Sequence, residues 1–197
     1  MDKALARKLL GLPADVPLLL FGAMGGGQDP RKGFDLLAGA LQYLRGKVPG
    51  MELVVFGQRA PQQPPELGFP VHFTGHLHDD LSLRALYCAA DALVVPSRQD
   101  NLPNTAVEAQ ACGTPVVAFD VGGLPDIVEH MVTGYLARAH DPVDMANGFK
   151  WLLNKNADIA QIRSDARSKA IIKWSFSSIA EAYSMEYKDI LITKLRI

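Results

Sequence analysis

Cysteine, excess basic charge and long apolar runs are all scarce in this sequence, and each shortage excludes a class of protein. The two cysteines, Cys88 and Cys112, lie in separate apolar patterns without a CxxC partner, so we expect buried free thiols in a reducing cytoplasm. The 20 basic and 21 acidic residues give a formal net charge of −1, which provides no basic field for nucleic acid. No apolar run reaches the roughly 18 residues of a membrane span, and residues 1–10 alternate charge with leucine, unlike a signal peptide.

Short apolar runs alternate with helical patterns along the chain, which predicts an α/β fold. The runs at residues 18–21, 53–56 and 92–95 are apolar throughout and are followed by glycine or proline, which is typical of buried parallel strands. Six are expected, at residues 18–21, 53–56, 71–74, 92–95, 116–119 and, most weakly, 134–137. Helices are expected at residues 33–45, 81–90, 105–112 and 125–130, and from Asp141 to the end with breaks near Asn156 and Ser175. This order predicts one domain over residues 1–197, built on a Rossmann-like doubly wound parallel sheet with helices on both faces.

The loop after the first expected strand, residues 22–33, is rich in glycine and ends in two cations. Gly25 and Gly26 let the backbone approach a ligand closely, and Arg31 and Lys32 can pair with phosphate. For this segment taken alone, a flexible loop with two solvated cations is an equal alternative. The loop has neither the GxxxxGK(S/T) pattern of a P-loop nor the GxGxxG pattern of a dinucleotide site, which argues against a nicotinamide-dependent oxidoreductase.

The third expected strand ends in Phe73, Thr74 and Gly75. A strand end followed by glycine can present backbone amide and carbonyl groups to the edge of a flat base. A plain strand terminus explains these residues equally well. Three histidines lie within residues 72–78, but no cysteine or glutamate accompanies them at ligand spacing, so no metal site is expected.

Residues 96–120 place two carboxylates, Asp100 and Glu108, eight positions apart around the start of a helix. Pro103 at the first helical position leaves the amides of Asn104 and Thr105 to point at an anion. Glu108 lies about one and a half turns further on and can accept two hydrogen bonds from a ribose diol. An exposed helix carboxylate is the alternative, but its neighbours are nearly all apolar and an isolated acid there requires a partner. This pattern predicts a nucleotide-sugar site.

Together these segments resemble the C-terminal, donor-binding domain of family 4 glycosyltransferases of the GT-B fold. The matching segments follow the family order and cover nearly the whole chain: FGAMGGGQDPRKGFDLL, MELVVFG, VHFTGHL, LYCAADALVVPSRQDNLPNTAVEAQACGTPVVAFDVGGLPDIV, TGYLA and WSFSSIAEAYSMEYKDIL. The long fourth segment is the most specific of them. The resemblance implies transfer of a sugar from a nucleotide-diphosphate donor with retention of anomeric configuration.

The resemblance also implies a role for each site residue. The acid-x7-acid motif of the family falls on Asp100, implied to touch the donor sugar, and on Glu108, implied to bind the ribose. Lys32 matches the lysine that neutralises the diphosphate, which implies electrostatic catalysis by front-face displacement with no metal and no cofactor. The first acid is usually glutamate, and here it is aspartate. The segment after it, which includes Asn101 and Leu102, resembles a subset of the family acting in bacterial polysaccharide synthesis.

Family members also carry an N-terminal acceptor domain that the residues of this chain do not include. The final helix, expected at residues 177–197, resembles the one that packs on that domain, so we expect this chain to bind donor but turn it over poorly. Tyr183, Met185, Tyr187 and Ile190 would then present apolar surface for self-association. Peripheral contact of the full-length enzyme with the inner face of a membrane is compatible with the sequence.

The alternative function is a non-catalytic nucleotide-binding or interaction module of the same fold. A pyridoxal-phosphate phosphorylase would need a Schiff-base lysine motif, which we do not find.

Overall fold

The chain forms a six-stranded parallel sheet, as the apolar runs predict. The computed structural model describes residues 1–22, 29–154 and 158–194, and its strand order is β3-β2-β1-β4-β5-β6 with parallel pairing throughout. The strands are β1 (Leu18–Gly22), β2 (Glu52–Phe56), β3 (Val71–Gly75), β4 (Ala92–Val95), β5 (Val116–Phe119) and β6 (Gly134–Ala137). Each begins and ends within one residue of its expected position. The strands β1, β2, β4 and β5 are buried almost throughout and need uninterrupted apolar sequence, whereas the edge strand β3 is half-buried along its length.

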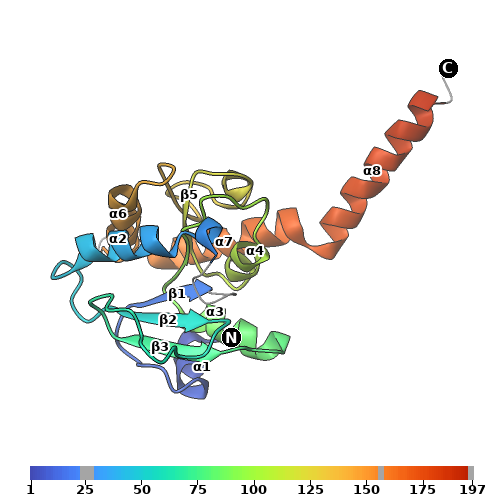
Figure 1. Cartoon of the computed structure of the whole chain (residues 1–197). Helices are drawn as coiled ribbons and strands as arrows, with labels where there is room; N and C mark the ends of the chain where they lie inside the picture. The colour runs from blue at the N-terminus through green and yellow to red at the C-terminus, as the bar shows by residue number, and fades with distance from the viewer. Residues whose placement is uncertain (23–28, 155–157, 195–197) are drawn as a thin grey trace.

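Helices cover both faces of this sheet (Figure 1). One face carries α2 (Phe34–Leu44) and α6 (Pro142–Leu152), and the other carries α3 (Asp80–Ala89), α4 (Asn104–Ala111) and the short α5 (Leu124–Ile127). The expected Rossmann-like architecture is therefore confirmed. The starts of α2, α3, α4 and α5 each differ from expectation by one residue, and α5 ends at Ile127 rather than at residue 130. Gly33 caps α2 in a left-handed conformation instead of opening it, and Pro103 caps α4 instead of occupying its first position.

The hydrophobic core lies in two layers on either side of the sheet. Successive side chains of a strand point to opposite faces. Leu19 and Phe21 of β1 therefore pack under α2 and α6, while Leu18 and Leu20 pack under α3 and α4. All four are at most 2 % exposed. Burial on both faces fixes the strands in place, and the strands in turn position the loops that follow their carboxyl ends.

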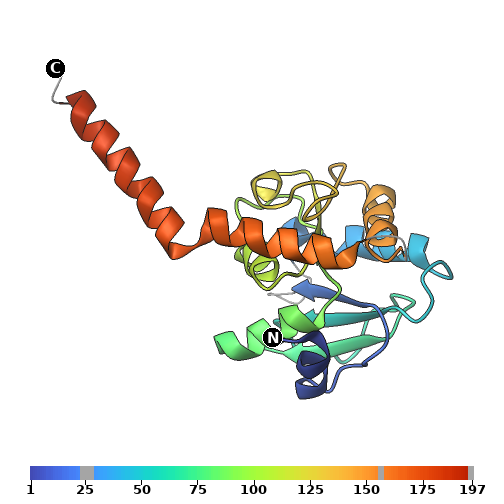
Figure 2. The same ribbon diagram turned by 180° about the vertical axis from the view of Figure 1, so that it is seen from behind.

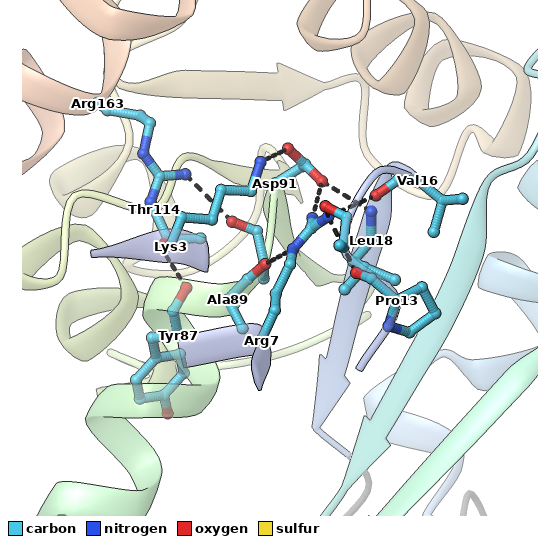
Figure 3. A network of polar contacts seen from close by, with 12 residues as sticks. Lys3, Arg7, Pro13, Val16, Leu18, Tyr87, Ala89, Asp91, Thr114 and Arg163 are labelled. Carbon is cyan, nitrogen blue, oxygen red and sulfur yellow. Dashed lines mark hydrogen bonds and ion pairs between the residues drawn. The ribbon is translucent and has the colours of Figure 1, made fainter. Parts of the chain in front are cut away.

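A first helix, α1 (Lys3–Leu9), was not expected from the sequence, and a buried arginine fastens it to the domain (Figure 3). Arg7 is 3 % exposed. Its guanidinium donates hydrogen bonds to the Ala89 carbonyl at 2.9 Å and to the Asp91 carboxylate at 2.8 Å. Three further acceptors are the carbonyls of Pro13, Ala14 and Val16. Asp91 also accepts from the backbone N–H of Leu18 at the start of β1, so α1 is tied to the amino ends of the central strands.

Of the last two helices, the first lies along the compact part of the molecule and the second leaves it (Figures 1 and 2). α7 (Ile159–Trp174) packs against α4 and ends at Ser175, where a break is expected. α8 (Phe176–Lys194) then projects away from the sheet, one residue earlier than expected at its start. Its residues are exposed from 181 to 193, so the surface predicted for self-association is available. The break expected near Asn156 lies outside the described residues.

The part of the chain that the structure describes contains no helix with both the length and the apolar character needed to cross a membrane.

Candidate functional site

The strand order reverses its direction of growth between β1 and β4, which are neighbours at the centre of the sheet. Loops that follow such a pair leave in opposite directions and open a crevice at the carboxyl ends of the strands. Lys32 follows β1, and Asp100 follows β4. The topology therefore brings two of the predicted site residues to the position where doubly wound folds bind their ligands.

Lys32 and Asp100 form an ion pair in this crevice. The Lys32 ammonium lies 2.8 Å from Asp100 Oδ2, and the Ser97 hydroxyl donates to the same oxygen at 3.3 Å. The Lys32 side chain is 41 % exposed, whereas Asp100 is largely buried. A cavity of about 30 Å³ next to the pair, also lined by Thr105, holds no more than a water molecule. A nucleotide sugar would therefore lie over the pair, on the exposed side of the lysine.

Two glycines hold the Asp100 loop against its neighbours. Gly33 has φ 64°, and a Cβ built on it would lie 1.9 Å from the Pro96 carbonyl oxygen. Gly122 has φ 55°, and a Cβ there would lie 1.8 Å from the carbonyl oxygen of Asp100 itself. A side chain at either position would force the loop to move, since real Cβ atoms do not approach so closely. The loops after β1, β4 and β5 consequently pack as one unit around the ion pair.

Arg31, the other predicted cation, points elsewhere. Its guanidinium binds Asp29, with the nearest contact at 2.8 Å, and its side chain is 72 % exposed. The hydrogen bonds from Arg31 hold the pKa of Asp29 below its usual value. Asp29 is the N-cap of the 3-10 turn η1 (Pro30–Lys32) that presents Lys32, and Arg31 lies within that turn. In this structure the Arg31 guanidinium pairs with Asp29, and its part in donor binding stays a prediction.

Glu108 has a partner that the sequence did not identify. The Tyr87 hydroxyl, from α3, donates a 2.8 Å hydrogen bond to Glu108 Oε2 on α4. Tyr87 is 2 % exposed, and burial, followed by the neighbouring Glu108 carboxylate, raises the pKa of this phenol. The phenol therefore stays protonated and acts as a hydrogen-bond donor. Sequence reasoning indicated that the acid needed a partner, but not which residue provides it.

Tyr87 and Glu108 line a cavity of about 440 Å³ between α3 and α4. This volume is within the range of small-molecule sites. This cavity shares no lining residue with the small cavity at the Lys32–Asp100 pair, so the predicted catalytic residues lie in two places rather than one. A larger cavity of about 680 Å³ lies between α5 and α7 and contains none of the predicted residues. We place the site at the strand ends because charged groups converge there from two central strands.

The residues predicted to bind the base end the edge strand β3. Phe73 packs partly into the core, and the Thr74 hydroxyl approaches the Val55 carbonyl at 3.5 Å. Gly75 has φ 72°, and its carbonyl accepts a 2.8 Å hydrogen bond from the N–H of Gly57. That carbonyl is thus engaged with the sheet.

The remaining predicted residues surround the start of α4. Asn101, Leu102 and Asn104 are exposed, and Thr105 is half-buried. Among the described residues, no side chain makes a capping hydrogen bond at this helix start, which fits a helix end that receives an external anion. Gly25 and Gly26 lie outside the described residues.

The histidines of residues 72–78 have protein partners. His72 Nε2 lies 2.5 Å from Glu52 Oε2, and the rings of His76 and His78 stack 6.1 Å apart. Among the described residues, no group of three or more histidine, cysteine or acidic side chains could hold a metal ion.

Comparison with known proteins gives the family. The family model described as glycosyl transferases group 1 matches residues 18–155. The chain is 39 % identical over 172 residues to D-inositol 3-phosphate glycosyltransferase of Xylanimonas cellulosilytica, an alignment that covers 82 % of this chain and 40 % of the relative. It is 34 % identical to D-inositol 3-phosphate glycosyltransferase 2 of Catenulispora acidiphila, covering 99 % of this chain and 49 % of the relative. The chain thus spans less than half the length of these curated relatives.

Solved structures agree with this assignment. Sucrose-phosphate synthase from Thermosynechococcus elongatus superimposes with a TM-score of 0.80 at 30 % identity, over 98 % of this chain and 50 % of that one. Anabaena Alr3699/HepE, solved in complex with UDP, superimposes with a TM-score of 0.78 at 25 % identity, over 95 % of this chain and 52 % of that one. The expected resemblance to one half of a GT-B enzyme is confirmed. Since the family model matches more than half of its residues, the chain belongs to the glycosyl transferases group 1 family.

Proposed function

We propose that this chain is the donor-binding half of a retaining glycosyltransferase and binds a nucleoside-diphosphate sugar across the carboxyl ends of β1 and β4. The observation that supports this most directly is the Lys32–Asp100 ion pair at the point where the strand order reverses. An exposed lysine beside a helix start that no side chain of the described residues caps provides both a charge and backbone amides for a diphosphate. The HepE structure contains UDP, which makes a uridine nucleotide the first donor to test.

Each site residue has a separate task in this proposal. Lys32 and the first amides of α4 stabilise the negative charge that develops on the departing nucleoside diphosphate, which is electrostatic catalysis without a metal or cofactor. Asp100 orients the Lys32 ammonium and accepts hydrogen bonds from hydroxyls of the donor sugar. Glu108 accepts hydrogen bonds from the ribose. No side chain acts as a nucleophile, so the acceptor attacks the same face that the leaving group vacates.

The acceptor is bound by a second domain in the proposed full-length enzyme, with α8 packing on it. Within the described part of the helix, the exposed apolar side chains include Tyr183, Met185, Tyr187 and Ile190. Such a surface calls for a partner, either that domain or a second copy of the chain. Turnover by this chain alone is therefore expected to be slow. We place the enzyme in bacterial polysaccharide or glycoconjugate synthesis, in the cytoplasm at the inner face of the membrane.

Titration calorimetry of the chain with UDP, GDP and ADP, each with its sugar conjugates and with and without EDTA, tests the proposal. Saturable binding of one nucleotide that survives EDTA and is weakened by Lys32→Ala supports it. The charge-matched control is Lys169→Ala, which removes an ion pair with Glu129 on another part of the surface. Absence of binding to every nucleotide would favour a non-catalytic module of the same fold.

A further inference from the structure

We propose that Arg98 is a positioning residue that holds Lys32 in place for the diphosphate, and this inference rests on the proposed function. Arg98 lies in the loop after β4, two residues before Asp100. Its guanidinium forms a bidentate pair with Asp35 in the first turn of α2, with distances of 2.7 and 2.5 Å. The arginine therefore bridges from the loop after β4 to the helix that follows β1.

Arg98 also forms hydrogen bonds to the turn that carries Lys32. Its Nη1 donates to the Pro30 carbonyl at 3.0 Å, and its backbone N–H donates to the Arg31 carbonyl at 2.7 Å. Both acceptors belong to η1, a helix of only three residues with little stability of its own. Lys32 is the last residue of that turn. Its ammonium can keep its 2.8 Å contact with Asp100 only while the turn keeps its place against the loop.

The carbonyl of Arg98 is engaged as well. It lies 3.2 Å from His140 Nε2, in the loop after β6. Together with the close contact of Gly33 on Pro96, these bonds fix the position of η1 from several sides. Arg98 takes part in most of these bonds, because both its side chain and its main chain form hydrogen bonds.

Several features distinguish a positioning role from direct contact with phosphate. The guanidinium charge is already matched by the Asp35 carboxylate, whose pKa is lowered by that hydrogen bond. An exposed ion pair contributes little to global stability, so its loss should alter the site more than the fold. Arg98 and Asp35 should then behave alike, because removing either releases the same bridge. A direct phosphate ligand would instead be freed, and not weakened, by loss of Asp35.

The experiment measures how much the diphosphate adds to binding, as the ratio of UDP to uridine affinity, in Arg98→Ala, Arg98→Lys and Asp35→Ala. GDP with guanosine and ADP with adenosine are run in the same way. We expect each variant to lower this ratio about fivefold to tenfold, with uridine affinity unchanged and a melting temperature within about 3 °C of wild type. Lysine should not rescue, because it cannot form the bidentate pair. Lys169→Ala is the control for loss of a surface ion pair.

A double-mutant cycle with Lys32→Ala decides the mechanism. If Arg98 acts through Lys32, Arg98→Ala should have no further effect on UDP affinity in the Lys32→Ala background. Additive losses, or a ratio that is unchanged or raised in Asp35→Ala, would overturn the inference and make Arg98 a direct ligand or a bystander. Failure of the proposed function would give a different result from failure of this inference, because wild-type protein would then bind no nucleoside diphosphate.

Discussion

The Tyr87 hydroxyl on α3 donates a 2.8 Å hydrogen bond to Glu108 Oε2 on α4, and this bond joins the two helices that border the proposed ribose position. The donor is buried and the acceptor is exposed. One carboxylate oxygen is therefore fixed from inside the fold, and the carboxylate keeps further acceptor capacity for a ligand. Glu108 is held in place before any nucleotide arrives.

Removing either member of this pair should weaken nucleotide binding, but to different degrees. Glu108→Ala should cost about 1–3 kcal/mol of binding free energy for the cognate nucleoside diphosphate, because charged hydrogen bonds to the ribose are lost. Tyr87→Phe should cost only about 1 kcal/mol, the value of one hydrogen bond that orients the carboxylate. Titration calorimetry measures both. Unchanged affinity in Glu108→Ala would remove this residue from the site.

Asp100→Ala should affect recognition of the sugar more than recognition of the nucleotide. Asp100 accepts hydrogen bonds from Lys32 and Ser97 and is proposed to touch donor hydroxyls. The variant should therefore bind the nucleotide sugar and the bare nucleoside diphosphate with more nearly equal affinities than wild type does. The measurement is the ratio of the two dissociation constants. Equal proportional losses for both ligands would contradict the assigned role.

Gly122→Ala should disrupt the site, whereas Gly46→Ala should not. Both glycines have positive φ, 55° and 69° respectively, so both substitutions incur backbone strain of similar size. A Cβ at Gly122 would also meet the Asp100 carbonyl oxygen at 1.8 Å, while nothing lies within 4 Å of one at Gly46. We expect Gly122→Ala to be less stable than Gly46→Ala by at least about 2 kcal/mol in denaturant unfolding. Equal stabilities and equal nucleotide affinities would show that the loop is not held at this point.

Arg7→Met should destabilise the domain by about 3–5 kcal/mol, because the Asp91 carboxylate would lose its buried partner. The Ala89 carbonyl and the three carbonyls of the α1–β1 loop would lose their donor as well. Lys8→Met, at an exposed neighbouring position of α1, is the matched control and should change stability little. Denaturant titration followed by circular dichroism compares them. A small effect at Arg7 would mean that α1 is not integral to the fold.

The sheet and its helices could be predicted from sequence because their signal is local. Strands buried on both faces need continuous apolar runs, and the short runs of Leu18–Gly22 and Ala92–Val95, which end at or before glycine or proline, favour strands. The α1 helix gave no such signal, since its residues alternate charge with leucine. Its stability depends on Arg7 meeting Ala89, 82 positions away in the sequence. A contact between residues so far apart in the chain leaves no pattern in the local sequence.

Some features of the candidate site could likewise be predicted from the sequence, and others could not. Lys32 and Asp100 were both predicted as site residues from the sequence, because each follows an expected strand at its carboxyl end. Their ion pair was not predicted, since it depends on the order of the strands in the sheet. The partner of Glu108 could not, because the meeting of Tyr87 and Glu108 depends on the packing of α3 on α4. No sequence pattern indicated a role for Arg98, because it lies in a loop without hydrophobic periodicity. Its contact with Asp35 is seen only in the fold.

A crystal structure of the chain with its cognate nucleoside diphosphate tests the proposed site most directly. We predict the diphosphate within hydrogen-bonding distance of Lys32 Nζ and of the first amides of α4, with the ribose hydroxyls on Glu108. A nucleotide seated in the α5–α7 cavity, or anywhere away from the carboxyl ends of β1 and β4, would contradict the proposal.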